Sequence, residues 1–117
     1  MPLLFSYGTL RQASVQLELF GRQLSGGPDD LLGYERSMIT VADAAFAQTS
    51  GSAQHAMLRP SPDPDARVPG MALEVTDQEL AIADRYEPVE YRRVVANLAS
   101  GRQAWVYVAA KPRTSDS

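Results

Sequence analysis

The sequence predicts a single α+β domain, because several short strand patterns surround two helix patterns within 117 residues. That length supports one hydrophobic core and is too short for two. Hydrophobic residues make up 44% of the chain and charged residues 21%, as in ordinary globular proteins. We expect about six or seven strands and two helices, with residues 1–110 forming the domain and residues 111–117 a flexible tail.

The first strand and the first helix are predicted close together. Residues 3–6 are mostly apolar and predict a strand, whereas residues 12–20 predict a helix in which Val15 and Leu19 are i,i+4 neighbours. Gly21 then fits the left-handed position just past the end of a helix.

The middle of the chain is marked by turn residues and prolines. Residues 26–28, Gly-Gly-Pro, predict a turn, and the small polar segment at residues 42–52 predicts a loop. The prolines within residues 60–65 cannot donate to a sheet, so this segment is predicted to be a surface loop. Strands are predicted between these segments, at residues 31–34, 37–41, 56–59 and 68–75. The first two of them could form one bent strand.

The second helix is the best specified element. Thr76 and Glu79 have the spacing of a capping box, in which each side chain binds the other residue's backbone N–H. The helix is predicted to end near Tyr86, because Pro88 cannot continue it. Two further strands joined by a hairpin are predicted at residues 91–98 and 103–109.

The composition excludes several classes of site. The chain has no cysteine, which excludes disulfides, thiolate nucleophiles and cysteine-ligated zinc. His55 is the single histidine, so one chain cannot build a site from two or three histidines. We interpret His55 as an exposed or strand-edge residue, and we expect no metal and no cofactor. Any proton chemistry would therefore rest on carboxylates and tyrosines.

Charge and hydropathy narrow the range of partners. The net charge is −3 and no basic stripe is present, so we expect no nucleic acid partner. No apolar run approaches the roughly 20 residues of a membrane span, and the N-terminus lacks the features of a signal peptide. We therefore expect a cytoplasmic protein without membrane contact. Whether it is a monomer or a homodimer is open at this point.

The turn directly after the first strand is a candidate anion site. Residues 7–11, Tyr-Gly-Thr-Leu-Arg, lead from the strand to the first helix within a few residues. This order aims several backbone N–H groups at one point, where these groups and the helix dipole both favour negative charge.

Glu87 is the candidate acid/base residue. It follows Leu80 by seven residues and Ala83 by four, which places it on the core-facing side of the second helix. Partial burial and the C-terminal end of the helix dipole would both raise the pKa of its carboxyl group. The alternative interpretation is a surface glutamate paired with Arg92 or Arg93.

Two neighbours of Glu87 in the sequence could take part in the same site. Asp84 lies three residues earlier and could add like-charge repulsion. Tyr91 opens the next strand and could carry its hydroxyl into a pocket, which makes it a candidate substrate-binding residue. A core or strand-edge aromatic residue is an equally good interpretation of Tyr91, as it is of Tyr7 and Tyr107.

Taken together, these segments resemble the gamma-glutamylcyclotransferase family. Its members carry a Tyr-Gly-(Ser/Thr) turn after the first strand, which residues 7–11 match. They also carry Asp, then Glu three residues later, then a Tyr-x-Arg. Asp84, Glu87 and the segment beginning Tyr91-Arg92 match that pattern. The strand at residues 68–75 resembles the family's strand before the capped helix.

The resemblance implies both a fold and a site. The fold would be a small mixed β-barrel of about six strands, flanked by two or more helices. Glu87 would be the catalytic residue. Backbone groups of the first turn would hold the glutamyl head group of a small-molecule gamma-glutamyl substrate, at Tyr7, Gly8, Thr9 and Leu10. Residues 42–67 match nothing in the family pattern, and we expect them to shape the pocket for the leaving group.

The implied reaction is an intramolecular cyclisation. The α-amine of a gamma-glutamyl group attacks its own side-chain amide carbonyl, which gives 5-oxoproline and a free amine. Glu87 would accept the proton of the α-ammonium group and pass it to the leaving amine. Two alternatives stay open: a non-catalytic binding module for an amino-acid-like ligand on the same fold, and an amidohydrolase or transferase that uses the same site.

Overall fold

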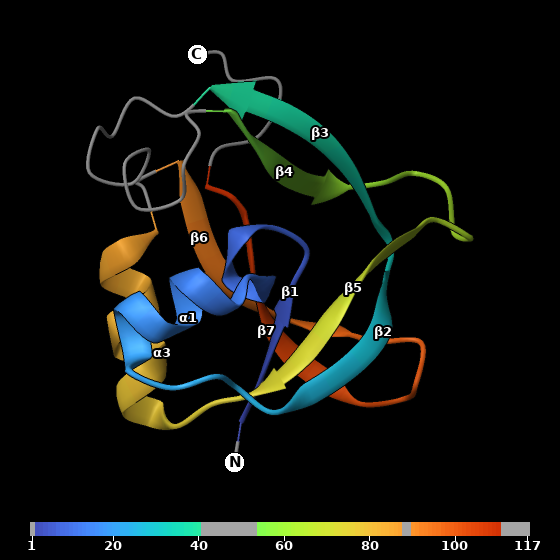
Figure 1. Ribbon diagram of the computed structural model, residues 1–117. Coiled ribbons are helices and arrows are strands. Elements are labelled where there is room, and N and C mark those ends of the chain that lie inside the picture. Colours follow the sequence, from blue (N-terminus) through green and yellow to red (C-terminus); the bar gives the residue numbers. More distant parts are fainter. Residues whose placement is uncertain (1, 41–53, 88–89, 111–117) are drawn as a thin grey trace.

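The computed structural model describes residues 2–40, 54–87 and 90–110, which contain ten helical and strand elements (Figure 1). In chain order these are β1 (Leu3–Ser6), the 3-10 helix η1 (Thr9–Arg11), α1 (Ala13–Phe20), β2 (Gly26–Leu32), β3 (Tyr34–Thr40), β4 (Gln54–Pro60), β5 (Arg67–Glu74), α3 (Asp77–Tyr86), β6 (Tyr91–Asn97) and β7 (Gln103–Ala109).

The strands form a five-stranded mixed sheet and a two-stranded sheet. The larger sheet has the order β2-β5-β1-β7-β6, in which β1 and β7 run parallel while the other neighbours are antiparallel. The smaller sheet pairs β3 with β4. One isolated antiparallel bridge pairs Leu31 of the edge strand β2 with Leu98, the residue just after the other edge strand, β6. The predicted α+β class is confirmed, whereas closure of a barrel is not shown by the described strands and stays a prediction.

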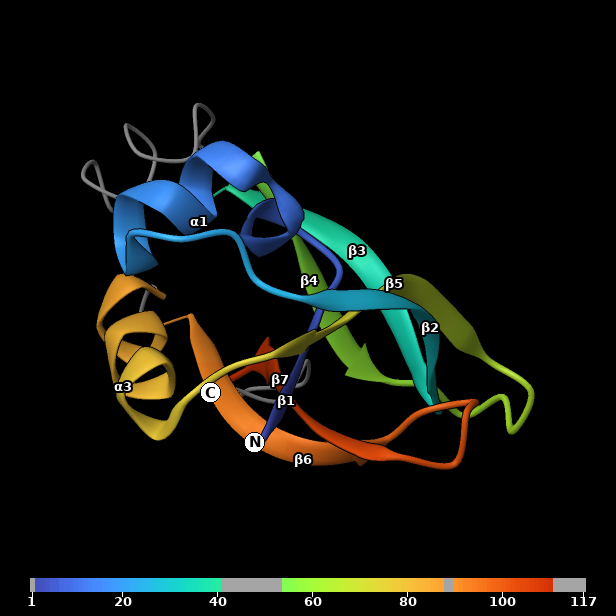
Figure 2. The ribbon, with the colours of Figure 1, turned by 60° about the horizontal axis from the view of Figure 1, so that its bottom comes forward.

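The larger sheet buries apolar side chains on both of its faces. Figures 1 and 2 show α1 and α3 side by side over one face, while β3 and β4 lie toward the other end of the molecule. Leu4 is fully buried against the helices with Val15 and Leu80, and Phe5 is buried on the opposite face with Leu58. This alternation along β1 is the two-residue period of a strand with a core on each side.

Several local predictions are confirmed. Gly21 ends α1 in the left-handed conformation, with φ 72° and its N–H donating to the Leu17 carbonyl at 3.0 Å. Thr76 and Glu79 form both hydrogen bonds of the capping box that begins α3. The hairpin predicted from residues 91–98 and 103–109 is present as β6 paired with β7, with Gly101 at φ 92° in its loop.

The prediction of a turn at residues 26–28 is wrong. These residues begin β2, where Gly27 pairs with Ala72 and Pro28 with Met71 on β5. Because β2 lies at an edge of the sheet, the N–H that proline lacks is not needed by a second neighbour. The chain instead bends at Gly33, which has φ 82° and separates β2 from β3. The loop predicted at residues 42–52 and the tail at residues 111–117 lie outside the described residues.

Gly70 on β5 is a position where no side chain fits. A Cβ atom there would lie 2.4 Å from the Ser6 carbonyl oxygen and 2.6 Å from Cζ of the Phe5 ring. We expect Gly70→Ala to lower the free energy of unfolding by about 2 kcal/mol or more, because the central strands would have to separate. Urea denaturation measures this effect. Gly27→Ala is the control, since a Cβ at Gly27 meets nothing within 4 Å. Equal losses in both variants would contradict the steric explanation.

Candidate active site

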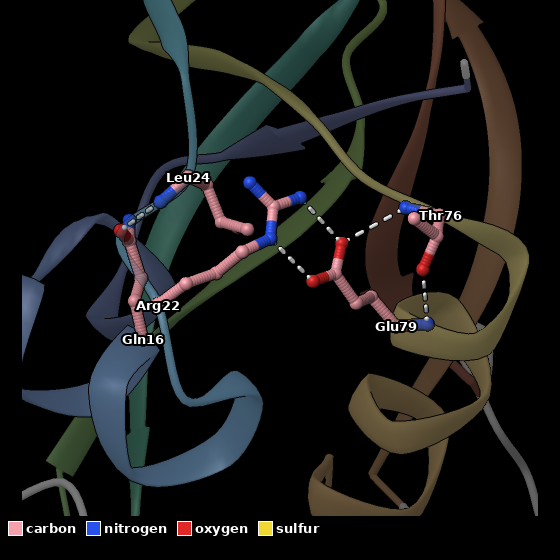
Figure 3. Close-up of polar contacts among 5 residues, drawn as sticks. All are labelled: Gln16, Arg22, Leu24, Thr76 and Glu79. Carbon is pink, nitrogen blue, oxygen red and sulfur yellow. Dashed lines mark hydrogen bonds and ion pairs between the residues drawn. The ribbon is translucent and has the colours of Figure 1, made fainter.

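The turn after β1 is fixed at both of its ends. Tyr7 is buried, and its hydroxyl donates to the Tyr107 carbonyl at 2.5 Å, which ties the end of β1 to β7. At the other end, Gln16 on α1 donates through Nε2 to the Leu10 carbonyl at 2.8 Å. The Gln16 Oε1 in turn accepts from the Leu24 N–H at 2.9 Å (Figure 3). The turn that continues directly from Tyr7 through Gly8 is therefore held by the sheet and by α1.

Gln16 is a residue that the sequence analysis missed. It is 5% exposed, and it is the buried polar side chain of α1. The sequence feature that could have identified Gln16 is its place directly after Val15, which is buried. A buried amide must find partners for its donor and acceptor groups.

A second polar contact joins the end of α1 to the start of α3. Arg22 forms a fork with Glu79, with Nε to Oε2 and Nη2 to Oε1 both at 2.8 Å (Figure 3). The same Glu79 carboxylate accepts from the Thr76 N–H at 2.9 Å. The hydrogen bonds from Arg22 and Thr76 outweigh burial and lower the pKa of Glu79. This carboxylate is thus a structural anion that orients the two helices.

Glu87 stands at the C-cap of α3. Its N–H donates to the Ala83 carbonyl at 2.9 Å, and both Leu80 and Ala83 on the same helix face are buried. Burial is the larger cause and the charge of Asp84 the smaller one that together raise the pKa of the Glu87 carboxyl to about 8. The predicted direction of the shift is confirmed, and desolvation is its main source.

Three tyrosines share the electrostatic environment of Glu87. Burial raises the pKa values of Tyr7, Tyr91 and Tyr107 above the ordinary tyrosine value, and the charge of Glu87 raises each of them further. Their hydroxyls therefore stay protonated and act as hydrogen-bond donors at neutral pH. The Tyr91 hydroxyl donates to the Ala56 carbonyl of β4 at 2.7 Å, which joins β6 to the smaller sheet.

Arg93, one of the two arginines considered as partners of Glu87, forms its ion pair with Asp84 instead. Arg93 binds Asp84 through a fork, with Nε to Oδ1 at 2.9 Å and Nη2 to Oδ2 at 3.0 Å. The alternative interpretation, in which Arg93 pairs with a surface Glu87, is therefore wrong for Arg93. The Glu87 carboxyl is left as a partly buried acid with a pKa near neutral, as general acid–base chemistry requires.

The fold brings several of the predicted site residues close together. Glu87 at the end of α3 acts electrostatically on Tyr7 after β1, on Tyr91 at the start of β6 and on Tyr107 of β7. Glu87 is close enough to Tyr7 and Tyr91 for its charge to raise the pKa values of both hydroxyls. Gly8, Thr9 and Leu10 follow Tyr7 directly, with Thr9 and Leu10 in η1. The side chain of Thr9 is outside what the structure describes.

Metal ligands do not gather in the described part of the chain. Within residues 2–40, 54–87 and 90–110, no group of three or more histidine, cysteine, aspartate or glutamate residues is arranged to hold an ion. His55 lies on β4 opposite Ile39, and its side chain is not described. None of the described helices combines the length and the apolar character that crossing a membrane demands.

Comparisons with known proteins address the family and the fold. The model of the family described as gamma-glutamyl cyclotransferase, AIG2-like, matches residues 4–117. A search of curated proteins gives no match.

Three solved structures share the fold. The Arabidopsis thaliana protein At5g39720.1 is similar with a TM-score of 0.73 and 20% identity, over 98% of this chain and 71% of that one. Its Arabidopsis counterpart At3g28950.1 gives 0.70 and 22%, over 96% and 66%. The uncharacterized protein PH0828 from Pyrococcus horikoshii gives 0.63 and 19%, over 97% and 82%. The chain thus spans about two thirds of the plant proteins' length, and these identities show the fold alone.

Proposed function

Since this chain belongs to the gamma-glutamyl cyclotransferase, AIG2-like family, we propose that it cyclises a gamma-glutamyl amide to 5-oxoproline with Glu87 as general acid and base. One observation carries the assignment of the base. It is the Glu87 carboxyl at the C-cap of α3, whose pKa burial raises to about 8 and whose charge acts on Tyr7 after β1 and on Tyr91 at the start of β6.

The reaction balances without a cofactor. The substrate's α-ammonium group gives a proton to Glu87, and the free amine attacks the carbonyl carbon of its own side-chain amide. One C–N bond forms in the five-membered ring, and the original amide C–N bond breaks. Glu87 returns its proton to the departing amine, and the ring nitrogen gives up its second proton as the tetrahedral intermediate collapses, so the lactam keeps one N–H and the amine leaves as an ammonium ion. The enzyme thus ends in its starting state.

The chain's part in this chemistry is proton transfer and positioning. A carboxyl group with a pKa near 8 accepts a proton from an ammonium group with little free-energy cost, because the two pKa values are similar. The nucleophile belongs to the substrate, so holding the folded conformer is a large part of the rate enhancement. Backbone N–H groups of Gly8, Thr9 and Leu10 would bind the α-carboxylate or the developing oxyanion. Tyr7 and Tyr91 would line the space that the glutamyl group occupies.

Two other functions use the same site. A binding module would hold an amino-acid-like ligand without changing it. An amidohydrolase or transferase would let water or another amine attack the same carbonyl. Product analysis separates all three, because only cyclisation gives 5-oxoproline.

The test is release of 5-oxoproline from a panel of gamma-glutamyl compounds: glutathione, gamma-glutamyl-alanine and gamma-glutamyl-lysine. We expect 5-oxoproline and the free amine in equal amounts from at least one of them, in proportion to enzyme concentration. Free glutamate as the product would favour the amidohydrolase. Saturable binding with no product would favour the binding module, and either result would contradict the proposal.

A further inference from the structure

The carboxylate of Asp84 accepts hydrogen bonds from two residues of the sheet. Arg93 contributes the fork described above, and the Tyr107 hydroxyl donates to Oδ1 at 2.7 Å. The Arg93 guanidinium also lies 4.3 Å from the centre of the Trp105 ring, which is the geometry of a cation–π contact. A fork of this kind fixes the orientation of both partners as well as their distance.

Strand register explains why these side chains meet. Arg93 and Tyr107 are directly paired across β6 and β7, and Trp105 lies two residues from Tyr107. All three therefore share one face of the larger sheet. Asp84, in the last turn of α3, is bound on this face. Glu87 follows Asp84 by three residues, at the C-cap of the same helix.

Tyr107 also reaches the turn after β1. Its hydroxyl binds Asp84, while its backbone carbonyl accepts the hydroxyl of Tyr7 at 2.5 Å. One residue of β7 thus links the last turn of α3 to the start of the turn proposed to hold the glutamyl group.

We propose that Arg93 and Tyr107 are positioning residues: by binding Asp84 they hold the last turn of α3, and with it Glu87, against the sheet. Arg93 has a second role, since it supplies the positive charge that balances Asp84 beside Glu87. The inference deepens the proposed function and rests on it, because it concerns the residue that we propose as the base.

The ionisable groups near Glu87 come from every neighbouring element. In the described residues, Asp84 on α3 acts on Glu87, and Glu87 acts on Tyr7 after β1, Tyr91 on β6 and Tyr107 on β7. Tyr86 and Glu90 also act on Tyr91, and Arg93 on β6 acts on Tyr107. The tyrosines are neutral through the pH range of interest, because their pKa values are raised. Asp84 is the charge that raises the pKa of Glu87, and the Arg93 guanidinium bound to Asp84 would oppose that effect.

The test is a pH titration of the Glu87 carboxyl carbon by NMR, which needs no activity. We expect Arg93→Gln to raise the midpoint by about 0.5 pH unit or more, because the charge of Asp84 is then unbalanced. Asp84→Asn should lower the midpoint by a similar amount. The double variant should return close to the wild-type value, since both opposing charges are gone. Arg92→Gln is the matched control, as Arg92 is the exposed neighbour on the same strand.

A purely structural clamp gives a different result. Arg93→Gln would then lower thermal stability and leave the Glu87 midpoint unchanged, which would overturn the inference. Should Arg93→Gln fail to fold, Arg93→Lys keeps the charge and loses the fork. We expect it to retain the midpoint and to lower kcat by about 3- to 10-fold at an unchanged KM. Wild-type kcat in Arg93→Lys would refute the positioning role.

The same data separate this inference from the proposed function. Shifted midpoints in a protein that releases no 5-oxoproline would support the balancing role of Arg93 and refute the cyclotransferase. Product release with unshifted midpoints would support the cyclotransferase and refute the balancing role of Arg93.

Discussion

Glu87→Gln is expected to keep the fold and lose at least about 100-fold in the turnover of gamma-glutamyl substrates. Glutamine has nearly the same shape as protonated glutamate and can still form hydrogen bonds, yet it cannot accept the proton of an α-ammonium group. The loss should appear in kcat with little change in KM, because the missing interaction belongs to the transition state. Initial rates of 5-oxoproline release measure both constants.

The matched control for this variant is Glu18→Gln. Glu18 lies on the exposed side of α1, so the same chemical change there should leave the rate unchanged. Wild-type turnover in Glu87→Gln would refute the role of Glu87 as the base. Equal losses in both variants would point to a general effect of charge on the protein.

The second large effect concerns stability against pH. The pKa of Glu87 is about 8 in the folded protein and about 4.3 in an unfolded chain, so the folded state holds an extra proton between these values. The free energy of unfolding should therefore fall as pH rises through this window, by up to about 1.4 kcal/mol per pH unit. The stabilising contribution is fully present below the unfolded pKa and is lost as pH rises through the folded one.

Urea denaturation at pH 5, 6, 7 and 8 tests this prediction. Because glutamine does not titrate, Glu87→Gln should become progressively more stable than the wild type as pH rises from 5 to 8. The difference between the two proteins isolates Glu87, since the other titrating groups are common to both. Curves that stay parallel across this range would show that Glu87 has an ordinary pKa in the folded protein.

Elements whose signals are local could be predicted from the sequence. The capping box of Thr76 and Glu79 begins α3, and Gly21 ends α1, because both motifs act within one helical turn. The start of β2 could not be predicted, because residues 26–28 are turn residues by type. They become a strand only through pairing with β5, some 45 residues away in the chain, as in Pro28 with Met71.

In the candidate site, too, some features could be predicted from the sequence and others could not. The position of Glu87 followed from its spacing to Leu80 and Ala83, which one helix decides. The fork of Arg93 on Asp84 could not be predicted, since it depends on the register of β6 and β7 and on the packing of α3 against them. The sequence therefore allows the residues on a single helix face to be predicted, but not the contacts between separate elements.

The most direct test of the central claim, that Glu87 is the proton acceptor, is the dependence of kcat/KM on pH for 5-oxoproline release. Between pH 5.5 and 7 the substrate amine stays largely protonated, so the acidic limb in this range reports the free enzyme. With the pKa of Glu87 at about 8, kcat/KM should fall about tenfold for each pH unit below that value. The residual activity of Glu87→Gln should lack this limb. A rate that stays level from pH 8 down to pH 5.5 would contradict the claim.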